Sequence, residues 1–326
     1  MHIHIHEFPD SPFLKLTADE FHTAAALAGA AGQGHRLTMG ESIADYEAAA
    51  DTLEVLIATP GAVRRLDLMG APHLKLIQST AAGVDALAPF DMIPAGVKLL
   101  NNRGVHADRA GEFAIMAMLM LTTQMQCFAA DQRAQRWQRR PSGVVAGRRA
   151  TIVGVGGLGG GAARRARQFG IHVTGIRFGT DPHPDCDETL PIAALDTVLP
   201  TSDFLLLACP LTHATRHLLD ARRIALLAAH AGVINIGRGG LVDQPALIAA
   251  LNTHAIAGAV LDVFAAEPIP PGDPVWTAEN LIITPHISSD DPDHYNAATL
   301  AKFFANLATL AEGRDPPTLV DLSKGY

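Results

Sequence analysis

Cysteine is scarce in this chain, and its scarcity limits the kinds of protein the chain can be. The three cysteines, Cys127, Cys186 and Cys209, are odd in number and widely spaced along 326 residues. That pattern argues against a disulfide framework or a zinc knuckle, and it suits a reducing compartment. We therefore expect a cytoplasmic protein.

The chain also lacks a hydrophobic run long enough to cross a bilayer. Its longest apolar stretch lies around Phe113 to Leu121, well short of the ~20 residues that a transmembrane helix needs. The N-terminus does not show the basic, apolar and small-residue order of a signal peptide. We expect no membrane role.

Positive charge is in deficit. There are 25 Lys and Arg residues against 33 Asp and Glu, and the formal net charge is -8. This balance gives no overall electrostatic reason to bind nucleic acid, and Arg136, Arg139 and Arg140 form the one basic group of note. We expect no nucleic-acid partner.

The length and composition indicate a compact enzyme of two domains. A chain of 326 residues exceeds the usual size of one domain. Hydrophobic residues make up 48% of it and charged residues 18%, which is typical of a globular chain rather than a disordered or fibrous one.

Short apolar runs alternate with helical stretches throughout the second half of the chain. The predicted strands are Thr151–Val155, His172–Ile176, Asp203–Ala208, Gly232–Ile236, Ala259–Phe264 and Leu281–Thr284. The predicted helices between them are Leu158–Phe169, Ala221–His230 and Gln244–His254. This rhythm predicts an α/β fold with a doubly wound parallel sheet, whose strands end at one shared edge where ligands bind.

The first hundred residues repeat the α/β pattern less regularly. Strand candidates lie at Val55–Ala58, Leu74–Ser79 and Val97–Asn101, and they predict a second lobe. Residues Ala107 to Ala130 are predicted to form one long Ala- and Met-rich helix that connects the lobes and offers a possible dimer face. A further helix, Ala297–Ala311, is expected to return to the first lobe.

The opening residues alternate His and Ile, so His2, His4 and His6 could share one face of a strand. Three imidazoles on one face could bind a metal ion, but ordinary strand alternation explains the pattern better. We predict no metal site.

A glycine motif marks the cofactor site. Gly154-Val155-Gly156-Gly157-Leu158-Gly159 matches G-x-G-x-x-G, follows an apolar strand and opens a helix. In that context Gly154 makes the tight turn, Gly156 admits the pyrophosphate, and Gly159 lets helix and strand pack closely. The helix N-terminus adds free amides and the positive end of its dipole.

Arg177 stands near the position where NAD-selective sites carry an acidic residue that binds the ribose 2′-hydroxyl. A guanidinium can instead pair with a 2′-phosphate, and the next acid, Asp181, lies four residues on. We therefore predict NADP (NADPH) rather than NAD as the cofactor. In the alternative, Arg177 stacks on the adenine or points to solvent.

The motifs together resemble those of the D-isomer-specific 2-hydroxyacid dehydrogenase family, over nearly the whole chain. The resemblance rests on Ser79-Thr80-Ala81-Ala82-Gly83-Val84-Asp85, the glycine motif, Asn235-Ile236-Gly237-Arg238-Gly239-Gly240, Leu261-Asp262-Val263-Phe264, Glu267-Pro268 and Thr284-Pro285-His286. It implies a Rossmann cofactor domain, residues 101–288, inserted in a flavodoxin-like substrate-binding domain, residues 1–100 and 289–326. It also implies reduction of a small 2-keto acid, such as glyoxylate or hydroxypyruvate, to the D-2-hydroxy acid.

The resemblance assigns the catalytic roles to three residues. Arg238 would bind the substrate carboxylate and polarise the keto oxygen, a task that suits a permanent, planar cation. His286 would be the general acid and base, because the pKa of imidazole lies near neutrality. Glu267 would hold one tautomer of His286 and raise its pKa.

The resemblance also implies binding contacts. Asp262 would hold the nicotinamide carboxamide, with a simple cap of a helix or turn as the alternative. The backbone amides of Ala82 and Gly83 would bind the substrate carboxylate. The remaining expected cofactor contacts are Cys209, Pro210, Thr215, Ile236 and Ser288.

Two other functions compete with this interpretation. A formate dehydrogenase shares the scaffold, but it typically has glutamine where this chain has Glu267. An NAD(P)-sensing interaction protein without turnover stays possible, because a complete set of catalytic side chains does not exclude it. Asp108-Arg109-Ala110-Gly111 departs from the small apolar residues common in the family, which puts the size of the substrate in doubt. The resemblance implies a homodimer.

Overall fold

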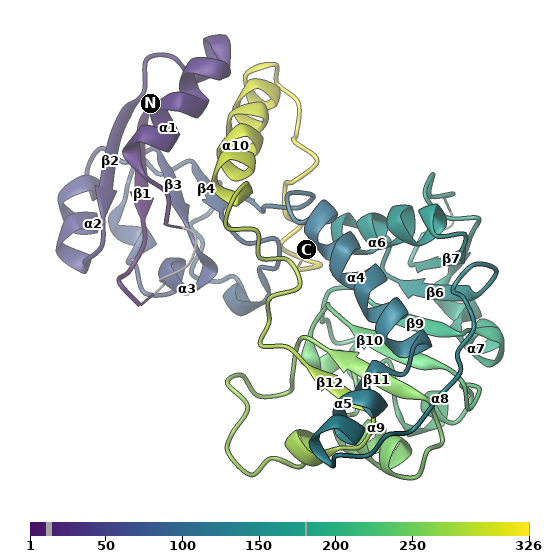
Figure 1. Ribbon diagram of the computed structural model, residues 1–326. Coiled ribbons are helices and arrows are strands. Elements are labelled where there is room, and N and C mark those ends of the chain that lie inside the picture. Colours follow the sequence, from purple (N-terminus) through teal and green to yellow (C-terminus); the bar gives the residue numbers. More distant parts are fainter. Residues whose placement is uncertain (11–14, 180, 326) are drawn as a thin grey trace. The chain divides into compact units, whose positions relative to one another are not determined.

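The computed structural model describes residues 1–10, 15–179 and 181–325. The chain divides into two compact units, each with its own sheet (Figure 1). The first unit comprises Met1–Val105 and Asp291–Tyr326, and the second is the continuous segment His106–Asp290. Both ends of the chain therefore belong to the same unit.

The first unit is a parallel sheet with helices on both faces. Its strands, in the order β2-β1-β3-β4-β5, are β1 (His2–His6), β2 (Arg36–Gly40), β3 (Val55–Ala58), β4 (Leu76–Ser79) and β5 (Lys98–Leu100). Helices α1 (Ala18–Leu27) and α10 (Tyr295–Ala311) pack on one face, while α2 (Ile43–Ala50) and α3 (Pro60–Val63) pack on the other. This is the flavodoxin-like strand order, as predicted.

Strand β1 is buried on both faces of the sheet. Because successive side chains point to opposite faces, its isoleucines lie on one face and its histidines on the other. Ile3 and Ile5 join the apolar core under α1 and α10. The imidazoles lie on the other face, where His2 Nε2 and His4 Nδ1 each lie 2.8 Å from Thr38 Oγ1. Across the part of the chain that the structure describes, no group of three or more His, Cys, Asp or Glu side chains could hold a metal ion.

The second unit holds a seven-stranded parallel sheet in the order β12-β11-β10-β9-β6-β7-β8. The strands are β6 (Arg149–Val153), β7 (His172–Arg177), β8 (Glu188–Pro191), β9 (Phe204–Leu207), β10 (Gly232–Asn235), β11 (Gly258–Leu261) and β12 (Leu281–Ile283). The helices are α4 (Ala107–Thr122), α5 (Met125–Arg133), α6 (Gly157–Gln168), α7 (Leu195–Val198), α8 (Ala221–Ile224) and α9 (Gln244–Asn252).

The strand order of the second sheet reverses between β6 and β9. From β6 the chain first moves outward to β7 and β8, then crosses back to β9 and continues to β12. Such a reversal opens a crevice outside the carboxyl ends of the strands, which is where ligands bind in open α/β sheets. Both doubly wound sheets of the predicted fold class are confirmed.

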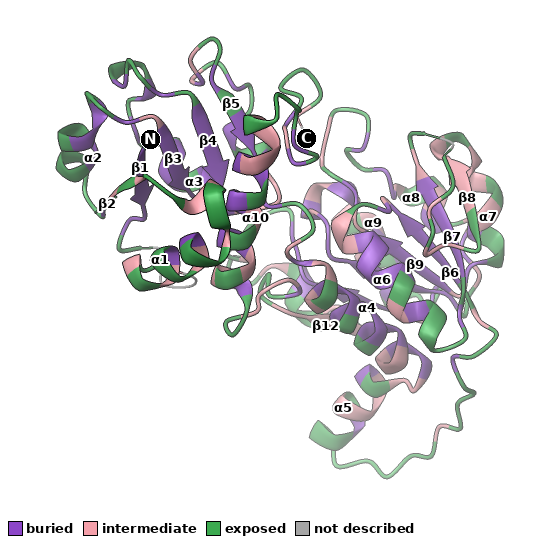
Figure 2. Cartoon of the chain, turned by 90° about the horizontal axis from the view of Figure 1, so that it is seen from above, coloured by how far each residue is buried: buried purple, intermediate pink, exposed green. Residues whose placement is uncertain are grey.

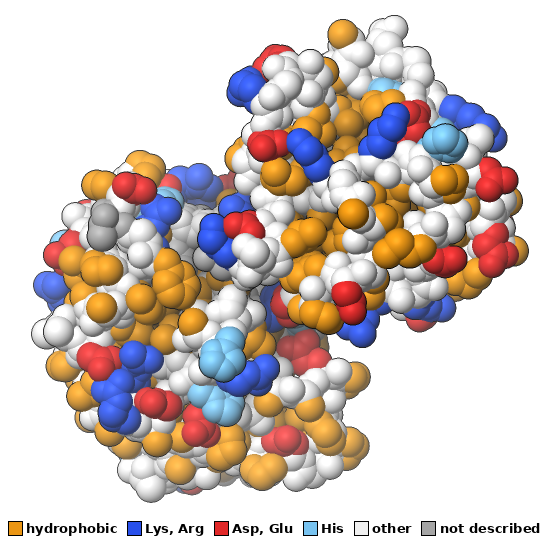
Figure 3. All heavy atoms as spheres, turned by 180° about the vertical axis from the view of Figure 1, so that it is seen from behind, with side chains coloured by type: hydrophobic (Ala, Val, Ile, Leu, Met, Phe, Trp, Pro, Cys, Tyr) orange, Lys and Arg blue, Asp and Glu red, His pale blue; other side chains and the backbone are white. Residues whose placement is uncertain are grey.

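The burial pattern matches this layered construction. Figure 2 shows the strands largely buried, whereas several helices have one buried and one exposed side. On the face drawn in Figure 3, basic and acidic side chains are interspersed rather than gathered by sign.

Two predicted helices are wrong. The one expected over Ala221–His230 ends already at Ile224, as α8. Residues 107–130 do not form a single helix, because α4 ends at Thr122 and α5 begins at Met125 after a bend of 64°. Gln124 between them has a left-handed φ of 56°. The hydroxyls of Thr122 and Thr123 donate to the carbonyls of Met118 and Leu119 one turn back, a contact that often bends helices.

Spanning a membrane requires a helix of sufficient length and apolar character. Among the described residues no single helix is long and apolar enough to span a membrane, while the bent pair α4 and α5 passes that test by length and composition alone.

Candidate active site

The loop that carries His286 is folded around a buried carboxylate. Asp262, directly after β11, is fully buried. Its Oδ1 accepts hydrogen bonds from the Thr284 hydroxyl at 2.6 Å and the Ile287 N–H at 2.9 Å, and its Oδ2 accepts one from the Ser288 N–H at 2.8 Å. The loop places His286 at a φ of 57°, a conformation uncommon for a non-glycine residue. Asp262 thus fixes the backbone on both sides of His286.

Asp262 therefore has the capping role that the sequence left as the alternative. Both of its oxygens already accept hydrogen bonds from the protein. Its expected contact with the nicotinamide carboxamide stays a prediction.

His286 and Glu267 form a hydrogen-bonded pair, with 2.7 Å between Nδ1 and Oε2. The other carboxylate oxygen, Oε1, accepts the Phe264 N–H at 2.8 Å. The hydrogen bond to Glu267 raises the pKa of His286 above its ordinary value, although burial opposes it. Burial would raise the pKa of Glu267, but the hydrogen bonds from His286 and Phe264 bring it below its ordinary value. Both shifts favour the imidazolium form of His286 and the carboxylate form of Glu267.

Arg238 follows β10 and is close enough to His286 and Glu267 for its charge to act on both. Its positive charge contributes to lowering the pKa values of both His286 and Glu267. The turn that carries it is fixed by Asn235, whose amide donates to the Arg238 carbonyl at 3.0 Å and accepts the Gly237 N–H at 3.1 Å. The structure thus brings together the three residues expected to be catalytic.

The glycine motif makes the turn between β6 and α6 and leaves space beside it. Gly154 has a φ of +89°, and a Cβ there would lie 2.6 Å from the Cys209 backbone nitrogen. A Cβ on Gly159 would lie 1.9 Å from the Gly154 carbonyl oxygen, whereas a Cβ on Gly156 would meet nothing within 4 Å. Helix α6 begins at Gly157, and the first N–H groups of a helix have no acceptor within it. These residues fit the pyrophosphate of a dinucleotide.

The loop after β9 is held by its own hydrogen bonds. The Thr215 hydroxyl donates to the Pro210 carbonyl at 2.7 Å and accepts the Thr212 N–H at 2.8 Å. Burial raises the pKa of the Cys209 thiol to about 12, which fits packing rather than nucleophilic chemistry. Ile236, after the next strand, is also buried.

Arg177 ends strand β7 and is partly exposed. Its Nη1 donates to the Asp181 backbone carbonyl at 3.3 Å. Among the described residues this is the one hydrogen bond of the guanidinium, so its remaining donors can contact a ligand.

Ala82 and Gly83 follow β4 in the first unit, and both are partly exposed. Among the described residues, their N–H groups donate to no acceptor. The preceding N–H, that of Ala81, donates to the Ser79 hydroxyl at 3.1 Å. Two successive free amides are therefore open to an anion.

Two further residues contact the loop after His286, and the sequence gave no sign of these contacts. His106 Nδ1 lies 3.0 Å from the Ser289 carbonyl, and Arg109 Nε donates to the Asp290 carbonyl at 3.2 Å. Arg109 belongs to the segment that departs from the family pattern. Its neighbour Asp108 instead pairs with Arg164 on α6.

Comparisons with known proteins agree with this geometry. A family profile described as "D-isomer specific 2-hydroxyacid dehydrogenase, NAD binding domain" matches residues 115–288. A glyoxylate reductase from Korarchaeum cryptofilum is 33% identical over 262 residues, which are 77% of this chain and 77% of that protein.

Two solved structures are similar over almost their full length. One is a D-isomer specific 2-hydroxyacid dehydrogenase from Xanthobacter autotrophicus Py2 in complex with NADPH and MES, with a TM-score of 0.85, 26% identity and coverage of 99% of each chain. The other is an NADPH-dependent glyoxylate/hydroxypyruvate reductase from Sinorhizobium meliloti in complex with NADP and sulfate, with a TM-score of 0.81, 26% identity and coverage of 100% of each chain. The chain therefore belongs to the D-isomer specific 2-hydroxyacid dehydrogenase family and is an oxidoreductase with a nicotinamide cofactor.

Proposed function

We propose that this protein reduces a small 2-keto acid, such as glyoxylate or hydroxypyruvate, to the D-2-hydroxy acid with NADPH. The observation that carries the proposal is the 2.7 Å hydrogen bond between His286 and Glu267 in the neighbourhood of Arg238. The similarity to glyoxylate reductases and to an NADPH-dependent glyoxylate/hydroxypyruvate reductase supports the substrate class and the cofactor.

Arg238 and two backbone amides bind the substrate in this proposal. The Arg238 guanidinium pairs with the carboxylate and polarises the keto oxygen, because its planar fork matches a planar anion. The N–H groups of Ala82 and Gly83 bind the same carboxylate. Binding through both the charge and the amides orients C2 of the keto acid for attack.

His286 supplies the proton. Because Nδ1–H donates to Glu267, the second proton of the imidazolium is on Nε2, which transfers it to the keto oxygen as C2 accepts a hydride. The raised pKa of His286 keeps that proton available near neutral pH. In the reverse direction neutral Nε2 removes the hydroxyl proton.

The nicotinamide cofactor supplies the hydride when bound. We assign its pyrophosphate to the α6 amides and the glycine turn, and its 2′-phosphate to Arg177. The full set of proposed cofactor contacts is Gly154, Gly156, Gly157, Leu158, Gly159, Arg177, Cys209, Pro210, Thr215, Ile236, Asp262 and Ser288.

Steady-state kinetics test this function. Glyoxylate, hydroxypyruvate, pyruvate and one bulkier 2-keto acid are each assayed with NADPH and NADH, and the product is resolved by chiral chromatography. We expect the highest kcat/KM for a small acid with NADPH, and a D product. An NAD(P)-sensing protein would bind NADPH but give no rate above background with any acid, and that result would overturn the proposal.

We also propose that the chain is a homodimer, with α4 and the segment after it as the contact surface. Phe113, Ala117 and Met118 of α4 are buried within their own unit, whereas Met116 on the same helix is 40% exposed. Exposed apolar side chains lie further along: Met125 is 44% exposed and Trp137 is 98% exposed. Tryptophan and methionine are enriched in surfaces that another protein covers.

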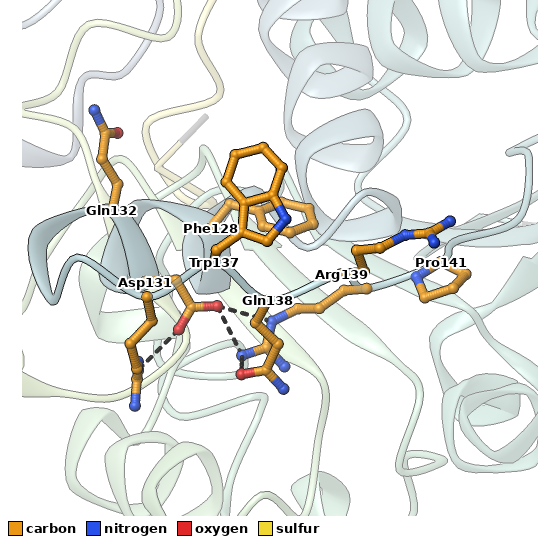
Figure 4. Close-up of a pocket in the computed structure, with 9 residues that line it drawn as sticks. Phe128, Asp131, Gln132, Trp137, Gln138, Arg139 and Pro141 are labelled. Atoms are coloured by element: carbon orange, nitrogen blue, oxygen red, sulfur yellow. Dashed lines mark hydrogen bonds and ion pairs between the residues drawn. The ribbon is translucent and has the colours of Figure 1, made fainter.

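Trp137 belongs to a defined pocket that α5 and the following segment line (Figure 4). Buried Asp131 holds this segment, because Arg136 and Arg140 each form an ion pair with it, at 2.8 Å and 2.9 Å. The basic group noted in the sequence is thus partly neutralised. We assign this surface to a second copy of the chain.

A further inference from the structure

We infer that Asn102 and Tyr295 are positioning residues that aim the backbone amide of Ala82 at the substrate carboxylate. The inference rests on the proposed function, because it concerns the loop after β4 to which that function assigns carboxylate binding. Neither side chain is placed against the substrate. Both act through the backbone carbonyl groups of the loop.

Asn102 holds two successive carbonyl groups of this loop. It follows β5 and is fully buried. Its side-chain amide donates to the Thr80 carbonyl at 2.9 Å and to the Thr299 hydroxyl at 2.7 Å, and its backbone N–H donates to the Ala81 carbonyl at 3.0 Å. The same residue therefore ties the loop to β5 and to α10.

Tyr295, at the start of α10, contacts the same loop. It is 5% exposed, and its hydroxyl donates to the Thr80 carbonyl oxygen that Asn102 also contacts. A carbonyl oxygen has two lone pairs, so both donors can be accommodated. The Thr80 carbonyl is thus fixed by side chains from two elements that are far apart in sequence.

The bonds to the Thr80 carbonyl fix the peptide group before Ala81, and the bond to the Ala81 carbonyl fixes the next one, to which the Ala82 N–H belongs. In a planar trans peptide the C=O and the N–H point in opposite directions. The Ala81 carbonyl points to the buried Asn102 N–H, so the N–H of the same peptide group, that of Ala82, points away from Asn102. That N–H is the first along the loop without an acceptor among the described residues, since the Ala81 N–H donates to Ser79.

If Asn102 and Tyr295 only stabilised the fold, their loss would lower Tm without changing carboxylate binding. Asn306 is a matched control for such a structural role. Asn306 on α10 is also buried, and its amide donates to the Gln78 side chain at 3.1 Å. This bond joins α10 to the sheet of the same unit without touching residues 80–83. Loss of Asn306 should therefore cost stability in the same way, but leave the direction of the Ala82 amide unchanged.

The test compares Asn102→Ala, Tyr295→Phe and Asn306→Ala in the full-length protein. For each variant we measure Tm, the Kd of NADPH, the KM of glyoxylate and the Ki of oxamate, a carboxylate probe that is not reduced. Asn102→Ala keeps the backbone N–H bond to the Ala81 carbonyl and removes the two side-chain bonds, to Thr80 and Thr299, that anchor the loop. The peptide group before Ala81 can then turn, and the Ala82 amide turns with it. We therefore expect the glyoxylate KM and the oxamate Ki to rise about tenfold, equivalent to ~1.4 kcal/mol. Tyr295→Phe should raise both about threefold, and neither variant should change the Kd of NADPH more than twofold.

Asn306→Ala should lower Tm with oxamate Ki unchanged. The inference is overturned if Asn102→Ala and Tyr295→Phe lower Tm but leave the Ki and KM at their wild-type values. If Asn102→Ala does not fold, the milder Tyr295→Phe variant decides the question by the same criteria. A wild-type protein that neither reduces keto acids nor binds oxamate would instead refute the proposed function itself, and the inference with it.

Discussion

Nδ1 of His286 lies 2.7 Å from Oε2 of Glu267, and this contact determines which imidazole nitrogen is left for chemistry. The carboxylate accepts a proton donor at Nδ1, so the proton that reacts must be on Nε2. Glu267 is itself oriented by the Phe264 N–H. The backbone therefore orients Glu267, and the Glu267 carboxylate in turn orients the imidazole of His286.

The pH dependence of reduction should follow His286. Its folded-state pKa is raised by Glu267, so kcat/KM for keto-acid reduction should stay high through neutral pH and fall only as the pH rises above that raised value. Glu267→Gln removes the main cause of the shift. The falling limb should move to lower pH, with kcat at pH 7 reduced about 10- to 100-fold.

Glu279→Gln is the matched control, because Glu279 also contacts a histidine, His254, at 3.4 Å on an exposed surface. Its pH profile should superimpose on that of the wild type. A Glu267→Gln profile with an unmoved falling limb would show that His286 is not the group that titrates.

Arg238→Ala should weaken both ground-state binding and catalysis. Removing a cation that contacts charge in the transition state costs roughly 3 kcal/mol or more in kcat/KM, about a hundredfold. Arg238→Lys should recover only part of this loss, since an ammonium lacks the planar fork. Arg222→Ala, at an exposed ion pair with Asp196, is the control. A kcat/KM of Arg238→Ala close to the wild-type value would show that Arg238 does not bind the substrate.

Arg177→Ser should change the cofactor preference. Loss of a hydrogen bond to a charged group costs about 1.5–3 kcal/mol, so the ratio of kcat/KM for NADPH over NADH should fall about 10- to 100-fold. The NADH value itself should change little. Should the wild type prefer NADH, or the ratio survive the substitution, Arg177 does not bind a 2′-phosphate.

Trp137→Ala should shift the protein from dimer towards monomer in size-exclusion chromatography with light scattering, because the substitution removes a large apolar side chain from the proposed contact. Trp276→Ala is the control, since Trp276 is 53% exposed and lies outside that surface. A wild-type protein of monomeric mass at micromolar concentration would contradict the dimer.

Acid should destabilise the first unit through His4. Burial lowers its folded-state pKa to about 4, below the model-compound value of 6.5. Folding therefore favours the neutral ring, so the contribution to stability is complete above pH 6.5 and is lost progressively as the pH falls towards 4. The loss amounts to at most about 3 kcal/mol.

Urea unfolding at pH 7 and pH 5 measures this loss of stability. Substituting His4 with Gln should reduce the difference between the two pH values, whereas substituting the exposed His22 on α1 should not. An equal difference in all three proteins would exclude His4 as a source of acid sensitivity.

Two of the four edge strands, β2 and β8, were not predicted from the sequence. β2 and β8 lie at the outer edges of their sheets, and most of their residues are exposed or half-buried. Without a continuous apolar run they resemble loops. The central strands, buried on both faces, were predicted to within a few residues.

The sequence by itself determined the fold class, the glycine turn and the family of the chain, because strand rhythm and ordered motifs are local properties of the sequence. It also suggested Arg238, Glu267 and His286, but only through resemblance. Three sets of contacts join segments that are about twenty residues apart in the chain. They are the hydrogen bond between Glu267 and His286 Nδ1, the hydrogen bonds to Asp262, and the hydrogen bond from Asn102 to the Thr80 carbonyl. Such contacts depend on how the strands and loops pack, so only the tertiary structure decided them.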